Sequence, residues 1–78
     1  MPKLPQLSGT QAVKCFEKMG YKTIRQRGSH IRMHHVNNPS KKPLTIPNHK
    51  TLGKGLLRKL LRDAELTIEE LLKLLKIT

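Results

Sequence analysis

Histidines and arginines crowd one short segment, and their spacing allows acid–base or ligand chemistry. Residues 25–35 read RQRGSHIRMHH, with a histidine directly after a Gly-Ser pair. Histidine titrates near neutral pH, so it can accept or donate a proton, and it can also bind a metal ion. Arginine binds phosphate groups through several N–H donors. Three hypotheses therefore fit this segment: a metal cluster, a nucleic-acid-binding strand, and a general acid or base.

Metal binding is the weakest of these hypotheses. His30, His34 and His35 are close in sequence, but strand geometry points His35 away from the other two. No carboxylate occurs between residues 18 and 62, and Cys15 is the only cysteine of the chain. The dense positive charge of this region would also repel a divalent cation. We therefore expect no metal ion and no small-molecule cofactor.

Acid–base catalysis on RNA requires fewer groups. The ribose 2′-hydroxyl is the nucleophile, so a base near it and positive charge near the phosphate are sufficient. His30 lies between Arg27 and Arg32, and neighbouring cations favour the neutral imidazole that can act as a base. Gly28 allows a sharp turn close to a phosphate. The pattern fits equally well a histidine that only hydrogen-bonds a phosphate in a non-catalytic RNA-binding module.

The distribution of charge indicates a polyanionic partner. The chain has 16 Lys and Arg against 5 Asp and Glu, and residues 18–62 contain no acid. Such a field attracts nucleic acid by electrostatic steering and by counterion release from phosphates. We expect the RNA contacts to come from the basic and turn residues around His30 and from a later basic loop. These residues are Arg25, Arg27, Gly28, Ser29, Arg32, His34, His49, Lys50 and Lys54.

A DNA-binding regulator is a third, weaker hypothesis. It would use residues 56–66, LLRKLLRDAEL, as a recognition helix. That segment has few of the Asn, Gln and Ser side chains that read base edges. We therefore favour RNA over DNA as the partner.

A helix and two strands are expected to position the histidine segment. Residues 8–21 predict a helix with Ser8 as N-cap, Gln11 at capping-box spacing and Gly20 just past the end. Residues 21–26 and 29–36 then predict two strands joined by a tight turn. Alternation along the second strand places three polar side chains on the face opposite Ile31 and Met33. They are His30, Arg32 and His34.

The second half of the chain predicts one more strand and two helices. Residues 44–47 predict a short strand that Pro47 ends or confines to a sheet edge, and residues 56–66 carry a leucine stripe at helical spacing. Thr67 and Glu70 have capping-box spacing at the start of a last helix, 67–78. We expect one α+β domain spanning residues 1–78: a helix, a three-stranded antiparallel sheet and a helix. Residues 1–7 are a lead-in, and residues 67–78 add a short C-terminal helix.

The composition predicts a small cytoplasmic protein. A single cysteine excludes an internal disulfide and fits a reducing compartment, and we expect Cys15 to be a buried helix residue. No apolar run approaches the roughly 18 residues of a membrane span, and the N-terminus lacks the apolar core of a signal peptide.

Short motifs follow one another along nearly the whole chain. In order they are Leu7-Ser8-Gly9, Gly20-Tyr21, Gly28-Ser29-His30, Ile46-Pro47-x-His49, Gly55-Leu56-Leu57 and Leu66-Thr67. In these motifs and their order the chain resembles the HicA toxin family of bacterial and archaeal toxin–antitoxin modules. One departure is that the proline expected soon after the histidine of the second strand is delayed to Pro39.

The resemblance implies a fold and a function. The fold is like that of a double-stranded-RNA-binding domain, and the activity is that of a metal-independent mRNA interferase. His30 would be the catalytic residue. The resemblance leaves the role of His49 open, and we expect it to contact substrate or support its loop rather than to act as a catalytic acid. A HicB-like antitoxin would occlude the site, covering the strand face around Arg25, Arg27 and Arg32. Independently of the resemblance, the last helix has more leucines than one face of a short helix accommodates: Leu71, Leu72, Leu74 and Leu75. We expect them to join this interface or a self-association surface, or to pack on the domain's own core.

Overall fold

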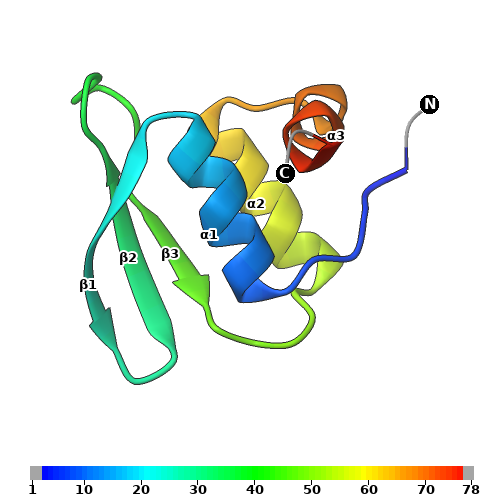
Figure 1. Ribbon diagram of the computed structural model, residues 1–78, viewed down its shortest axis with the longest axis horizontal. Helices are drawn as coiled ribbons and strands as arrows, with labels where there is room; N and C mark the ends of the chain where they lie inside the picture. The colour runs from blue at the N-terminus through cyan, green and yellow to red at the C-terminus, as the bar shows by residue number, and fades with distance from the viewer. Residues whose placement is uncertain (1–2, 77–78) are drawn as a thin grey trace.

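The computed structural model describes residues 3–76 of the chain. The elements follow as α1 (Gly9–Lys18), β1 (Tyr21–Arg27), β2 (His30–His35), β3 (Leu44–Pro47), α2 (Lys54–Ala64) and α3 (Ile68–Lys76) (Figure 1). This is the predicted α+β order, and it matches the layout of a double-stranded-RNA-binding domain with an added C-terminal helix. The ends of the predicted lead-in and last helix, residues 1–2 and 77–78, lie outside the described residues.

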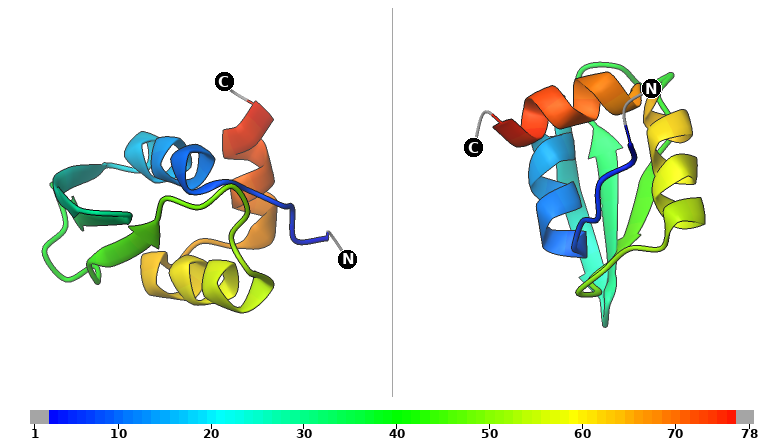
Figure 2. Two further views of the ribbon diagram at one scale, coloured as in Figure 1. Left: turned by 90° about the horizontal axis from the view of Figure 1, so that it is seen from below. Right: turned by 90° about the vertical axis from the view of Figure 1, so that its right-hand side faces the viewer.

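The sheet is antiparallel, in the order β1-β2-β3. The α1 and α2 helices lie on one face of it, as the side and bottom views show (Figure 2). Along β2, Ile31 and Met33 are buried beneath the helices, whereas His30 and His34 are exposed. The predicted alternation of this strand is confirmed. We call the helix-free surface of the sheet the outer face.

The strands differ from the prediction in their ends and in one irregularity. The β2 strand is shorter than residues 29–36 by one residue at each end, and the hairpin turn is Gly28–Ser29 rather than Arg27–Gly28. A β-bulge interrupts β1 between Thr23 and Arg25. The bulge was not predicted, because nothing in the sequence of β1 marks it.

Aliphatic side chains dominate the core between the sheet and the helices. Phe16 and Tyr21 are its two aromatic residues, and their rings meet edge to face with centroids 6.0 Å apart. The predicted stripe of α2 is mostly confirmed: Leu57, Leu60 and Leu61 are buried, and Ala64 continues the stripe. The α2 helix itself starts and ends two residues before its predicted limits, at Lys54 and Ala64.

The N-terminus of α1 is held tightly against the loop after β3. The predicted capping box is present: the Ser8 hydroxyl accepts from the Gln11 amide, and the Gln11 side chain accepts from the Ser8 amide. The amide of Gly9 donates to the carbonyl oxygen of His49 at 2.9 Å. A Cβ atom at position 9 would overlap the carbonyl oxygen of Pro47, so only glycine fits there.

The α3 helix packs on the rest of the protein through one side. Thr67 and Glu70 form the predicted capping box, and Leu71 is completely buried. Leu72, Leu74 and Leu75 are half-buried. Lys18 of α1 donates through Nζ to the carbonyl oxygen of Leu74 at 2.8 Å. The leucines of this helix are therefore largely accommodated by the domain's own core.

Candidate RNA-binding and catalytic site

The candidate site lies on the outer face, where β1 and β2 pair. Arg27 stands directly opposite His30, and Arg25 stands directly opposite Arg32. Directly opposed residues of an antiparallel pair point to the same side of the sheet. The structure thus brings together four of the residues predicted from sequence.

The bulge in β1 is what places the arginines on this face. β1 has seven residues and β2 has six. Tyr21 pairs with His35 at one end and Arg27 pairs with His30 at the other, so one residue of β1 between these two pairs remains unpaired. Ile24 is that residue. A β-bulge changes which side chains point to each face beyond it. Had Thr23 been followed by regular pairing, Ile24 would have opposed Arg32, and Arg25 would have turned toward the helices.

A shallow pocket joins the four residues. It has a volume of about 150 Å³ and is lined by Arg25, Arg27, His30, Arg32 and Thr45. We call these five residues the anion pocket. Its four ionisable members are three guanidinium groups and one imidazole, a combination that can bind an anion and exchange a proton with it.

Acidic groups are absent from the sheet. All five acidic residues of the chain lie on the helices or at the C-cap of α2: Glu17, Asp63, Glu65, Glu69 and Glu70. The three ion pairs among the described residues involve Glu65 and Asp63, away from the anion pocket. Like charges directly opposite each other, such as Arg25 and Arg32, destabilise a sheet. A bound polyanion would relieve this repulsion.

The hairpin turn sits beside His30. Gly28 has φ of 56°, the left-handed value needed at the first position of a type II′ turn, and glycine adopts it without strain. The side chain of Gln26 donates to the carbonyl oxygen of Gly28 at 3.0 Å. No atom lies within 4 Å of a Cβ built on Gly28, so the outside of the turn is open to a ligand.

The loop after β3 is tied to this turn, and both lie at the same end of the molecule (Figure 1). The amide of Asn48 donates to the carbonyl oxygen of Ser29 at 2.6 Å. His49 and Lys50, both predicted to bind RNA, are exposed on this loop, and Lys54 begins α2. They do not line the anion pocket. Their placement extends the basic surface from the turn toward α2.

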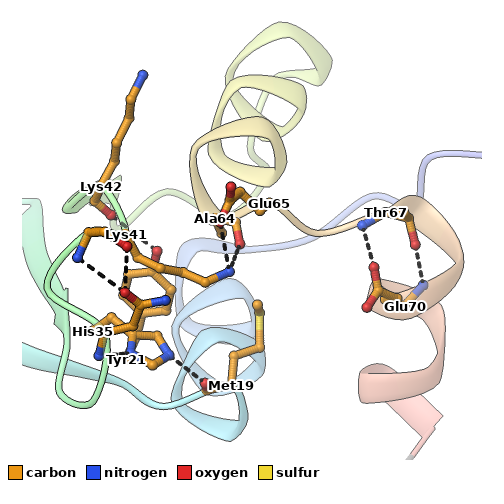
Figure 3. Close-up of polar contacts among 11 residues, drawn as sticks. Met19, Tyr21, His35, Lys41, Lys42, Ala64, Glu65, Thr67 and Glu70 are labelled. Carbon is orange, nitrogen blue, oxygen red and sulfur yellow. Dashed lines mark hydrogen bonds and ion pairs between the residues drawn. The ribbon is translucent and has the colours of Figure 1, made fainter.

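The remaining histidines of the segment have different environments. His34 is exposed on the outer face opposite Lys22, one pair beyond the anion pocket. His35 is half-buried on the helix side and acts as a structural residue (Figure 3). Its Nε2 lies 2.9 Å from the carbonyl oxygen of Met19, and its Nδ1 accepts from the amide of Asn38 at 3.0 Å. The prediction that His35 points away from the other two histidines is confirmed.

The described residues offer no ready metal site. Within residues 3–76, no three His, Cys, Asp or Glu side chains are grouped so that they could hold a metal ion. Cys15 is buried in α1, as predicted. Burial raises the pKa of its thiol and outweighs the opposite effect of the Lys18 ammonium group. None of the helices within residues 3–76 is both long and apolar enough to cross a membrane.

Two residues of the outer face were missed by the sequence analysis. Thr45 lines the anion pocket, and Lys22 flanks it beside His34. Thr45 alternates with Leu44 and Ile46, which are buried. This alternation places Thr45 on the polar face of β3, so the signal was present in the sequence.

Comparison with known proteins identifies one family. A family model described as the HicA toxin of bacterial toxin–antitoxin systems matches residues 9–66, which is 58 of the 78 residues. The matched region runs from the start of α1 to the residue before the capping box of α3. No curated protein and no solved structure matches the chain.

Proposed function

The chain belongs to the HicA toxin family, and on that premise we propose that it is a metal-independent RNA endonuclease in which His30 is the catalytic residue. As a member of the family it is the toxin of a toxin–antitoxin module. The observation that carries the proposal is the position of His30: an exposed imidazole in a pocket with three arginines, on a sheet face without acidic groups. We propose that it acts on mRNA in the cytoplasm.

The first step needs a proton acceptor at the ribose. His30 takes the proton from the 2′-hydroxyl, and the 2′-oxygen attacks the adjacent phosphorus. An exposed imidazole at a pocket mouth can reach this group, and general-base catalysis of this kind contributes typically 10²–10⁴-fold to a rate. Ser29 is not required as a nucleophile, because the substrate supplies its own.

The arginines stabilise the charge that develops on the phosphate. Negative charge builds up on the two non-bridging oxygens as the new P–O bond forms. Arg25, Arg27 and Arg32 line the pocket and present guanidinium donors that bind such oxygens in pairs. The 5′-oxygen leaves when the P–O bond to it breaks, and it takes a proton from the imidazolium of His30 or from water. The products are a 2′,3′-cyclic phosphate and a 5′-hydroxyl end.

The basic loop after β3 extends the binding surface. His49, Lys50 and Lys54 contact the RNA backbone beyond the scissile phosphate, consistent with their exposure and with the bond that ties Asn48 to Ser29. Backbone contacts of this kind supply most of the affinity of basic proteins for nucleic acid and are sensitive to salt.

The test compares two histidines of the same face. Purified protein is incubated with a long RNA, and cleavage is compared for the wild type, His30→Ala and His34→Ala. We expect His30→Ala to lower the cleavage rate by about 10²-fold or more. His34→Ala removes an expected RNA contact outside the anion pocket, so at saturating RNA its cleavage rate should stay within a few-fold of the wild type. Circular dichroism checks that both variants are folded.

Two outcomes would overturn the proposal. Undiminished cleavage by folded His30→Ala would exclude His30 as the catalytic residue. A wild-type protein that binds RNA tightly but never cuts it would support instead a non-catalytic RNA-binding module on the same fold.

A further inference from the structure

Thr45 is the uncharged member of the anion pocket, and it is bonded to one of the arginines. Its Oγ1 accepts a hydrogen bond from Nη1 of Arg32 at 2.8 Å. The two residues stand directly opposite each other on β3 and β2. Among residues 3–76, neither Arg25 nor Arg27 makes a comparable side-chain bond. Arg32 is therefore the arginine whose guanidinium group is held in place.

We propose that Thr45 is a positioning residue that holds the guanidinium group of Arg32 beside His30, where it meets the phosphate. The proposal rests on the proposed function, because it takes a phosphodiester as the ligand of the anion pocket. It adds to that function a residue outside the histidine segment, contributed by the third strand.

Arg32 needs such a restraint for two reasons. It directly opposes Arg25, and like charges in this position repel each other. Its long, flexible side chain also loses rotamer entropy when it is fixed. The bond to Thr45, on the strand farther from Arg25, draws the guanidinium group of Arg32 to the β3 side and holds it there.

Threonine suits the role because its own side chain is stiff. Two heavy atoms on Cβ restrict χ1, so the direction of the hydroxyl group is set by the strand backbone. A guanidinium group has five N–H donors, and the bond to Thr45 uses one of them. The other donors of Arg32 remain available for a phosphate oxygen.

The positioning of Arg32 by Thr45 should affect mainly kcat. Donors that are already oriented stabilise developing charge without reorganisation during the reaction, so a fixed guanidinium group helps the transition state most. Ground-state binding depends on all the basic residues of the surface and changes less when one of them becomes mobile. Loss of the Thr45 hydroxyl should therefore lower kcat more than it raises KM.

The experiment measures RNA cleavage by three threonine variants. Thr45→Val keeps the shape and strand preference but removes the acceptor. It should lower kcat about 10-fold, the size expected for one hydrogen bond to a charged group. Thr45→Ser keeps the acceptor and should stay within about 3-fold of the wild type. Thr23→Val is the matched control, a strand threonine outside the anion pocket, and should leave kcat unchanged.

A double-mutant cycle tests whether Thr45 acts through Arg32. In an Arg32→Gln background, Thr45→Val should cause no further loss of kcat, because there is no guanidinium group left to position. If Thr45→Val lowers kcat by the same factor in the wild-type and Arg32→Gln backgrounds, the proposal is overturned. A loss in Thr45→Ser as large as in Thr45→Val would overturn it too.

A measurement without cleavage separates this proposal from the proposed function. The side-chain NMR signal of Arg32 Nε–H is followed in the wild type and Thr45→Val, each with a single-stranded DNA oligonucleotide that lacks the reactive 2′-hydroxyl. The variant should show a more mobile Arg32. If the wild type fails to cut RNA but Arg32 still becomes mobile in Thr45→Val, only the proposed activity is wrong. An Arg32 signal that is identical in the two proteins would refute the positioning role itself.

Discussion

The Nε2 atom of His35 lies 2.9 Å from the carbonyl oxygen of Met19, so the end of β2 is bonded to the C-cap of α1 (Figure 3). The Nδ1 atom of the same ring accepts from the backbone amides of Asn37 and Asn38, at 3.3 and 3.0 Å. An accepting Nδ1 carries no proton, so Nε2 is the protonated nitrogen and donates to Met19. One neutral imidazole thus joins a helix, a strand and a loop.

The first prediction is that His35→Ala destabilises the fold. The substitution leaves backbone groups of Met19 and Asn38 without their partners and removes an edge-to-face contact with Tyr21. We expect a loss of about 2 kcal/mol in the free energy of unfolding, measured by urea denaturation. His34→Ala, the exposed neighbour, should change it by less than about 0.5 kcal/mol. Equal effects of the two substitutions would contradict the structural role of His35.

The second prediction is that cleavage survives removal of metal ions. EDTA should leave the cleavage rate unchanged, because the proposed chemistry uses an imidazole and guanidinium groups only. The products should carry 2′,3′-cyclic phosphate or its hydrolysis product, and a DNA strand of the same sequence should not be cut. Activity that is lost with EDTA and restored by a divalent metal ion would reject the mechanism, as would cleavage of DNA.

The third prediction concerns a HicB-like antitoxin as partner. We expect it to cover the outer face, so that amide hydrogen exchange slows in residues 24–34 when the complex forms. The association rate should fall steeply with added salt, because complementary charge steers the encounter. Arg25→Glu should slow association more than Lys73→Glu, a charge reversal on α3. Protection confined to α3, with cleavage still blocked, would instead show inhibition from a distance.

The fourth prediction is that Glu65→Gly stabilises the protein. Glu65 caps α2 with φ of 57°, a left-handed conformation that is unfavourable for a residue with a Cβ atom. Glycine removes that strain, although it loses more backbone entropy on folding. The ion pair with Lys41 is also lost, but the Glu65 side chain is 72% exposed and the pair contributes little. We expect a gain of roughly 0.5 kcal/mol in the free energy of unfolding.

The control for the fourth prediction is Glu69→Gly in the first turn of α3. There the backbone is already helical, so glycine should destabilise by about 1 kcal/mol. Thermal unfolding of the two variants should therefore shift in opposite directions. Two shifts of the same sign would mean that strain at Glu65 is not the cause.

The fifth prediction is a loss of stability in acid that depends on Glu70. Hydrogen bonds from the backbone and side chain of Thr67 lower the pKa of the Glu70 carboxyl group below its ordinary value of 4.5. As the pH falls, Glu70 is therefore protonated in the unfolded chain before it is protonated in the folded protein. The stabilisation is complete above pH 4.5 and is lost as the pH falls through the lower pKa of the folded state.

Glu70→Gln measures this contribution. The variant keeps an acceptor for the Thr67 amide but cannot titrate, so its stability should fall less steeply than that of the wild type below pH 4.5. Glu17→Gln on α1 is the control, because it removes one carboxyl group and leaves the capping box of α3 unchanged. If the wild type and Glu70→Gln lose stability in parallel, the capping carboxylate is not responsible for the acid sensitivity.

Local signals determined most of the fold. Ser8 with Gln11 and Thr67 with Glu70 set the starts of α1 and α3, because each capping box is made within four consecutive residues. The alternation of β2 determined that His30 and His34 share the exposed face, since successive strand residues point to opposite sides. These features depend on neighbours in the chain and can be derived without the tertiary structure.

Pairing between distant segments decided the rest. Ile24 bulges because seven residues of β1 must pair with six of β2, and this mismatch depends on both strands together. The bulge, rather than the alternation of β1 alone, turns Arg25 toward His30. Thr45 reaches Arg32 only because β3 lies beside β2 in register. The sequence by itself indicated which basic residues we expect to bind RNA, and the sheet decided which of them meet in one pocket, because register is a property of paired strands.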